Sequence, residues 1–169
     1  MRYSTVAAAA ALTLLTISTS LHGQRPDDQI DPRSMALLAK GQSAQASGNL
    51  DAASDALETA LAVDPRNRAA FVTLGDVSSA RGLPGKAIRF YREALLLEPN
   101  DVAALKGQGE ALVAKGAVQR AKDNLAKIRT LCGKASCSDA TQLAAVIAKG
   151  PPIATAAVDV SVVKATAKE

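Results

Sequence analysis

The sequence predicts an all-α fold of stacked helical hairpins, and three observations lead to that prediction. Small and apolar residues recur at a period of 34 positions, so Gly41 and Gly75 stand at the same place in successive copies. Within a copy, apolar residues three and four positions apart fall on one face of a helix. A glycine separates the two helical stretches of each copy, where the reversing chain needs a positive φ. These turn glycines are Gly48, Gly82 and Gly116.

The three copies share an ordered set of small, apolar and proline positions. In the first copy these are Leu37, Gly41, Gly48, Ala53, Leu57, Ala60 and Pro65. In the second they are Phe71, Gly75, Gly82, Ala87, Tyr91, Ala94 and Pro99. The weaker third copy has Leu105, Gly109, Gly116, Ala121, Leu125 and Ile128, with Gly133 in place of the proline. The period and order closely resemble those of the tetratricopeptide repeat (TPR) family, and the resemblance implies a non-enzymatic interaction module.

The pattern also sets the expected helices and domains. Helices are expected at 32–47, 50–63, 67–80, 85–97, 101–114 and 118–131. The three TPR-like repeats are expected at 34–67, 68–101 and 102–135. A seventh helix is expected within 136–150, because Ser136 and Asp139 have capping-box spacing ahead of an apolar pattern. It is expected to serve as a C-terminal capping helix, since a solenoid needs a terminal element with one polar face.

The two ends of the chain differ in composition from the repeats. Residues 1–23 read as a signal peptide: Arg2 precedes an apolar run that is too short for the roughly 20 residues of a membrane span. Cleavage after Ser20 and cleavage after Gly23 both fit. An exported bacterial protein, periplasmic or secreted, is therefore expected, and the alternative is an uncleaved anchor at 6–21 facing the periplasm. Residues 24–33 are expected to form a flexible lead-in and 151–169 a disordered tail.

The charge of the chain is modest and unevenly distributed. The formal net charge of +4 is too small to indicate nucleic-acid binding, and no aromatic residue is interleaved with the basic residues of the third repeat. Most of the excess lies in the third repeat. This basic end forms either a solvated outer face or a docking patch for an acidic partner or an anionic membrane surface. Its residues are Lys106, Lys115, Arg120, Lys122, Lys127, Arg129 and Lys134.

The residue inventory leaves little catalytic chemistry. The only histidine, His22, lies in the expected signal, so no Ser/His/Asp or Cys/His arrangement is expected, and no cofactor. Two thiolates cannot complete a four-ligand zinc site, so no metal is expected either. In an oxidising exported setting Cys132 and Cys137 are expected to form a disulfide, with two free thiols as the alternative. A remote alternative function is an enzyme that uses the carboxylates Asp76 and Glu110.

The TPR resemblance implies that the first helix of each hairpin lines a concave groove for a protein or peptide partner. The groove positions are Met35, Leu38, Gln42, Gln45, Ala69, Val72, Asp76, Ser79, Ala103, Lys106, Glu110 and Val113. Some family members grip a peptide carboxylate with a Lys and Asn clamp. Here the clamp positions hold Leu38, Gln42, Thr73, Ala103 and Gly107, so that mode is not supported. The repeat accounts for Gly109 but gives no reason for Gly107.

Overall fold

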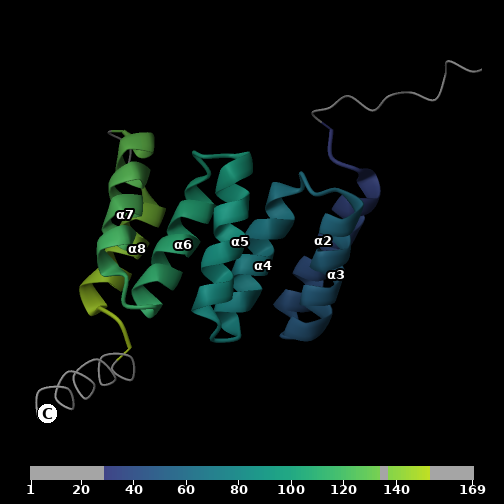
Figure 1. Ribbon diagram of the computed structural model, residues 1–169, viewed down its shortest axis with the longest axis horizontal. Helices are drawn as coiled ribbons and strands as arrows, with labels where there is room; N and C mark the ends of the chain where they lie inside the picture. Colours follow the sequence, from purple (N-terminus) through teal and green to yellow (C-terminus); the bar gives the residue numbers. More distant parts are fainter. Residues whose placement is uncertain (1–28, 134–136, 153–169) are drawn as a thin grey trace, which may run out of the picture.

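The computed structural model describes residues 29–133 and 137–152, and in this part of the chain all regular structure is helical (Figure 1). The helices are α2 (Pro32–Ala46), α3 (Leu50–Val63), α4 (Arg68–Ala80), α5 (Pro84–Leu97), α6 (Val102–Ala114), α7 (Val118–Cys132) and α8 (Ser138–Lys149). The first six begin and end within one residue of the expected bounds, and α8 lies inside the range expected for the seventh helix. The predicted all-α solenoid is confirmed.

Some expectations fall on other parts of the chain. The expected signal segment 1–23, part of the lead-in 24–33 and nearly all of the tail 151–169 lie outside the described residues. None of the helices in 29–133 and 137–152 is long and apolar enough to cross a membrane.

Local chain chemistry sets the ends of the helices. The three turn glycines have φ between +70° and +79°, a conformation that L side chains rarely adopt. Four helices are preceded by a residue whose side chain accepts a hydrogen bond from a backbone N–H in the first turn of the helix. Each of these bonds satisfies one of the N–H donors that would otherwise be unpaired there. These capping residues are Asp31, Asn49, Asn67 and Asp101.

The glycines inside the helices make room for large side chains from the partner helix. A Cβ placed on Gly41 would lie 2.5 Å from Cγ of Leu57 and 3.3 Å from the carbonyl oxygen of Ala53. A Cβ on Gly75 would lie 2.5 to 2.7 Å from three ring atoms of Tyr91. These distances are below normal van der Waals contact, so the two helices of the first hairpin and of the second can approach this closely only with glycine at these positions.

The hairpins stack in chain order, as Figure 1 shows. Each first helix packs on both helices of the hairpin before it: α4 contacts α2 and α3, and α6 contacts α4 and α5. The core between them consists mainly of alanine, leucine and valine, and Tyr91 is its largest buried side chain. Each hairpin thus buries its apolar face against its neighbours, as expected of a solenoid.

Helix α8 repeats this pattern once more, since it packs on α6 and α7. Its Leu143 is fully buried and occupies the space that a Cβ on Gly109 would need. Leu143 stands one repeat period after Gly109, at the position that is glycine in the three complete hairpins. We interpret α8 as the first helix of an incomplete fourth hairpin. In the described part of the chain no second helix follows α8 to complete this hairpin. The position in α8 can therefore hold leucine, whose side chain fills the space beside Gly109.

A disulfide joins the last repeat to this final helix. Cys132 ends α7 and Cys137 immediately precedes α8, and the two are bonded with their Cα atoms 6.0 Å apart. Both cysteines pack against the core cluster that contains Ile128 and Leu143. The bond closes a short loop, so its effect is local: it limits how far α8 can move from α7.

Candidate functional site

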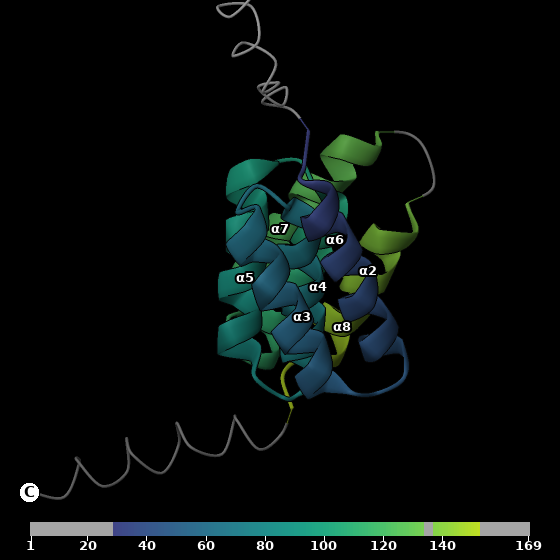
Figure 2. The same cartoon turned by 90° about the vertical axis from the view of Figure 1, so that its right-hand side faces the viewer.

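The candidate site is the surface formed by the outward-facing side chains of α2, α4 and α6, which we call the first-helix face. In the view along the array, α2 and α8 lie on one side and α5 on the other (Figure 2). Ten of the twelve predicted groove residues are at least partly exposed on this face. They are Met35, Gln42, Gln45, Ala69, Val72, Asp76, Ser79, Ala103, Lys106 and Glu110.

The other two predicted groove residues are core residues, so their assignment to the groove was wrong. Leu38 is 4% exposed and packs in the cluster that contains Leu74 of α4. Val113 is 2% exposed and packs with Ala121 of α7, with Ile147 of α8 against the same cluster. In both cases the helix that follows in the stack covers the side chain. The position of a residue within the repeat does not by itself show whether the next helix covers its side chain.

Tyr91 links the second hairpin to the first-helix face. Its ring lies against both Gly75 of α4 and Gly107 of α6. A Cβ added to Gly75 would lie 2.6 Å from Cζ of Tyr91, and a Cβ added to Gly107 would lie 2.6 Å from the hydroxyl oxygen of Tyr91. This contact supplies the reason for Gly107 that the repeat pattern lacks. The Tyr91 hydroxyl donates a hydrogen bond to Oδ1 of Asp76 at 2.6 Å. A residue of α5 therefore fixes the position of a carboxylate on α4.

The two carboxylates in the middle of the face have raised pKa values. Burial of the carboxyl group raises the pKa of Asp76, although the residue as a whole is exposed, and the hydrogen bond from Tyr91 and the charge of Lys106 oppose this shift. Burial also raises the pKa of Glu110, and the negative charges of Asp76 and Asp139 add to the effect. Burial and the hydrogen bond to Asp76 raise the pKa of Tyr91, so its hydroxyl stays protonated and remains a donor at neutral pH.

Lys106, the one cation predicted for the groove, is engaged within the chain. Its Nζ lies 3.0 Å from Oδ1 of Asp139 and donates to Oε1 of Gln142 at 3.0 Å. Both partners belong to α8, so this lysine ties α6 to the last helix. The charge left on this part of the face is therefore acidic, contributed by Asp76 and Glu110.

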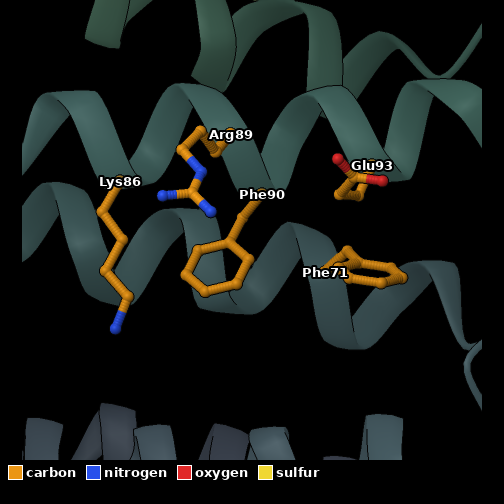
Figure 3. Close-up of a pocket in the computed structure, with 5 residues that line it drawn as sticks. All are labelled: Phe71, Lys86, Arg89, Phe90 and Glu93. Atoms are coloured by element: carbon orange, nitrogen blue, oxygen red, sulfur yellow. The ribbon is translucent and has the colours of Figure 1, made fainter.

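Two cavities lie near the second hairpin. One, of about 170 Å³, borders the first-helix face and is lined by Ser79, Gly82, Pro84, Glu110, Ala111 and Ala114. The other, of about 190 Å³, is lined by Phe71 of α4 and by Lys86, Arg89, Phe90 and Glu93 of α5 (Figure 3). It holds both phenylalanines of the chain, with Nζ of Lys86 5.5 Å from the ring centroid of Phe90. The sequence pattern does not predict this cavity, because its lining mixes apolar and charged residues from two helices.

Residues 29–133 and 137–152 contain no group of three or more His, Cys, Asp or Glu side chains placed to hold a metal ion. The chemistry that the described face offers is hydrogen bonding, charge and modest apolar contact.

Comparison with known proteins identifies the family. The sequence model of the tetratricopeptide repeat matches residues 38–95 and, in a second register, 72–127. The chain belongs to the tetratricopeptide repeat family. No curated protein matches its sequence.

Solved TPR domains share the fold. The Sgt2 TPR domain of Aspergillus fumigatus is 21% identical, with a TM-score of 0.66 over 74% of this chain and 83% of that one. The first TPR domain of Spaghetti (RPAP3), bound to the HSP90 peptide SRMEEVD, is 20% identical, with a TM-score of 0.65 over 75% and 97%. The second TPR domain of human RPAP3, in complex with an HSP70 peptide, is 16% identical, with a TM-score of 0.63 over 68% and 94%. At these identities the likeness shows the TPR fold alone.

The raised pKa of Glu110 predicts a pH dependence of stability. The folded chain holds this proton more tightly than the unfolded chain, so the stability that the proton contributes is present below the unfolded pKa of about 4.3 and is lost as the pH rises through the folded pKa. Glu110→Gln removes that loss, and no hydrogen bond of Glu110 is broken by the change. We expect the variant to gain stability over the parent from about pH 4 to about pH 7, measured by urea unfolding. Asp123→Asn, at an exposed carboxylate of α7, is the matched control, and equal gains in both variants would contradict the burial of Glu110.

Proposed function

We propose that this TPR protein is a non-enzymatic binding module that holds a segment of another protein on its first-helix face. The observation that carries the proposal is the row of partly exposed side chains on α2, α4 and α6, three helices that pack side by side. The likeness to the TPR domain of Spaghetti, which was solved with a bound peptide, supports the same use of the fold. The partner is a protein or peptide whose identity is to be found by experiment.

The chemistry of the face favours a neutral or basic segment. The peptide on Spaghetti ends in acidic residues, whereas here Asp76 and Glu110 stand in the middle of the face and Lys106 is already paired with α8. Clamp positions that bind a carboxylate elsewhere hold a buried leucine, Leu38, and the uncharged Gln42. An acidic peptide terminus would therefore meet like charge without a compensating cation.

The binding energy is expected to come from the few exposed apolar side chains. Met35 is 46% exposed and Val72 is half-buried, so both present apolar surface that a partner can remove from water. Polar residues such as Gln42 exchange hydrogen bonds to water for hydrogen bonds to a partner, with little net gain. The basic outer face of α7 is proposed to attract an acidic region of the partner or an anionic membrane surface, which mainly speeds encounter.

A carboxylate-based enzyme is the second candidate. Raised pKa values, like those of Asp76 and Glu110, are common among catalytic carboxylates. However, Asp76 has a structural role as the acceptor for Tyr91, and desolvation accounts for the shift of Glu110. A small molecule bound between these two carboxylates would favour catalysis over the binding role.

We also propose that the chain is exported, to the periplasm or out of the cell, after cleavage of a signal peptide within residues 1–23. The disulfide between Cys132 and Cys137 supports this, because such bonds persist in oxidising compartments. Mass spectrometry of the protein from its producing cell should find an N-terminus that follows Ser20 or Gly23. Recovery of residues 6–21 in the mature protein would favour the membrane-anchored alternative. Recovery of both cysteines alkylated without prior reduction would contradict an oxidising compartment.

The groove proposal predicts which substitutions weaken binding. With a partner captured by pull-down from the exported fraction, Met35→Ala and Val72→Ala should each weaken affinity about fivefold, as expected for loss of roughly 1 kcal/mol of apolar contact. Helical content by circular dichroism should stay unchanged. Isothermal titration measures the affinity.

The matched control neutralises the basic outer face of α7, at Arg120, Lys122, Lys127 and Arg129. This variant should lower the association rate in a salt-dependent manner and leave the dissociation rate nearly unchanged. If the Met35 and Val72 double variant binds like the parent while the neutralised variant does not bind, the site lies on α7 instead.

A further inference from the structure

The first hairpin leaves open a surface that is partly covered in the second hairpin. In the second hairpin, the side of α5 that faces the first hairpin is partly covered: Phe90 packs against the core cluster of α2, α3 and α4, and Nζ of Lys86 lies 3.6 Å from Glu58 of α3. The equivalent side of α3 points away from α4. Among the described helices, α2 and α3 contact each other, α4 and side chains of α5, all within the hairpin or toward the second hairpin, so no described helix packs on the opposite side.

This exposed surface, which we call the N-terminal edge, is hollow. A cavity of about 360 Å³ opens on it, lined by Leu37, Lys40, Ala52, Asp55, Ala56 and Thr59. Five of these residues stand 34 positions before the five residues that line the crevice of the second hairpin in Figure 3. The difference lies in size, because Ala52 and Ala56 replace Lys86 and Phe90. The first hairpin therefore has the shape of a packing face without the side chains that would fill it.

Two unpaired charges of opposite sign stand at this cavity. Lys40 projects from α2 and Asp55 from α3, and both are exposed. Within residues 29–133 and 137–152 the side chains of these two residues have no ion pair. The other lining residues are apolar or small, so the two charges decide which partner fits.

We propose that the N-terminal edge binds the same edge of a second copy of this chain. A two-fold axis parallel to the helices sets α2 of one copy against α3 of the other and forms an antiparallel four-helix arrangement. Lys40 and Asp55 lie at similar heights along the hairpin, because the neighbouring Gly41 packs against Leu57 and Ala53. Each Lys40 then meets the Asp55 of the other copy, and the contact is self-complementary.

The two-fold geometry also fills the cavity. Leu37 is a partly buried side chain of α2, and in the pair it lies over the small residues of α3 in the other copy. The opposite end of the array offers no such face, since α8 already packs on α6 and α7. Closure by one isologous contact gives a dimer and stops there. The inference is independent of partner binding on the first-helix face, which is a different surface of the molecule.

Charge reversal tests the pairing. The chain is purified in the form that its producing cell leaves, and sedimentation velocity measures its mass over a concentration series. We expect a monomer–dimer equilibrium in the parent. Lys40→Asp and Asp55→Lys should each weaken the dimer by about tenfold or more, because each converts two attractive pairs into two repulsive ones. The double variant, with both changes, should restore the affinity of the parent.

Lys122→Asp, at an exposed lysine of α7, is the matched control and should leave the dimer unchanged, and circular dichroism checks that every variant is folded. The proposal is overturned if the parent chain stays monomeric at its highest soluble concentration. This also holds if the reason is that residues 1–28 cover the edge. A dimer that ignores both single reversals, or that is not restored by the double variant, places the contact elsewhere and overturns it as well.

Discussion

The structure depends on the packing of one aromatic ring between two glycines. Tyr91 extends from α5 to the place where α4 and α6 meet, and Gly75 and Gly107 leave the space that its ring fills. The contact sets the spacing of these two first helices, and its hydroxyl fixes Asp76 at 2.6 Å. In a core made mainly of alanine, leucine and valine, Tyr91 is the largest buried side chain. Burial raises the pKa of Asp76, and the hydrogen bond from Tyr91 and the charge of Lys106 oppose that shift, while burial also raises the pKa of Glu110.

The sequence was sufficient for the helices because their signals are local. Turn glycines, caps and apolar spacing repeat within each copy, and each depends only on near neighbours along the chain. The need for Gly107 could not be predicted, because it arises from Tyr91 on another helix. The same limit explains why Leu38 and Val113 were wrongly predicted to line the groove. Both stand at groove positions of the repeat, but the helix that follows in the stack buries them. Which side of a helix is covered is decided by packing between hairpins.

The two ends of the array are finished differently. At the C-terminal end, Leu143 fills the space beside Gly109, Lys106 pairs with Asp139, and the disulfide limits the movement of α8. At the other end the equivalent packing surface stays open and carries Lys40 and Asp55. A solenoid buries its core only by stacking, so an open end is a place where a further unit can add. The first-helix face, between the two ends, stays accessible in either case.

The most direct test of this account is the free energy of unfolding of Gly107→Ala, measured by urea denaturation. The added methyl group overlaps the ring of Tyr91, so we expect a loss of roughly 1–3 kcal/mol. Gly85→Ala is the matched control, because a Cβ there meets nothing within 4 Å and should leave stability unchanged or raise it. In a Tyr91→Leu background the loss from Gly107→Ala should largely disappear. An equal loss in both backgrounds, or no loss in the parent, would contradict the role assigned to Tyr91.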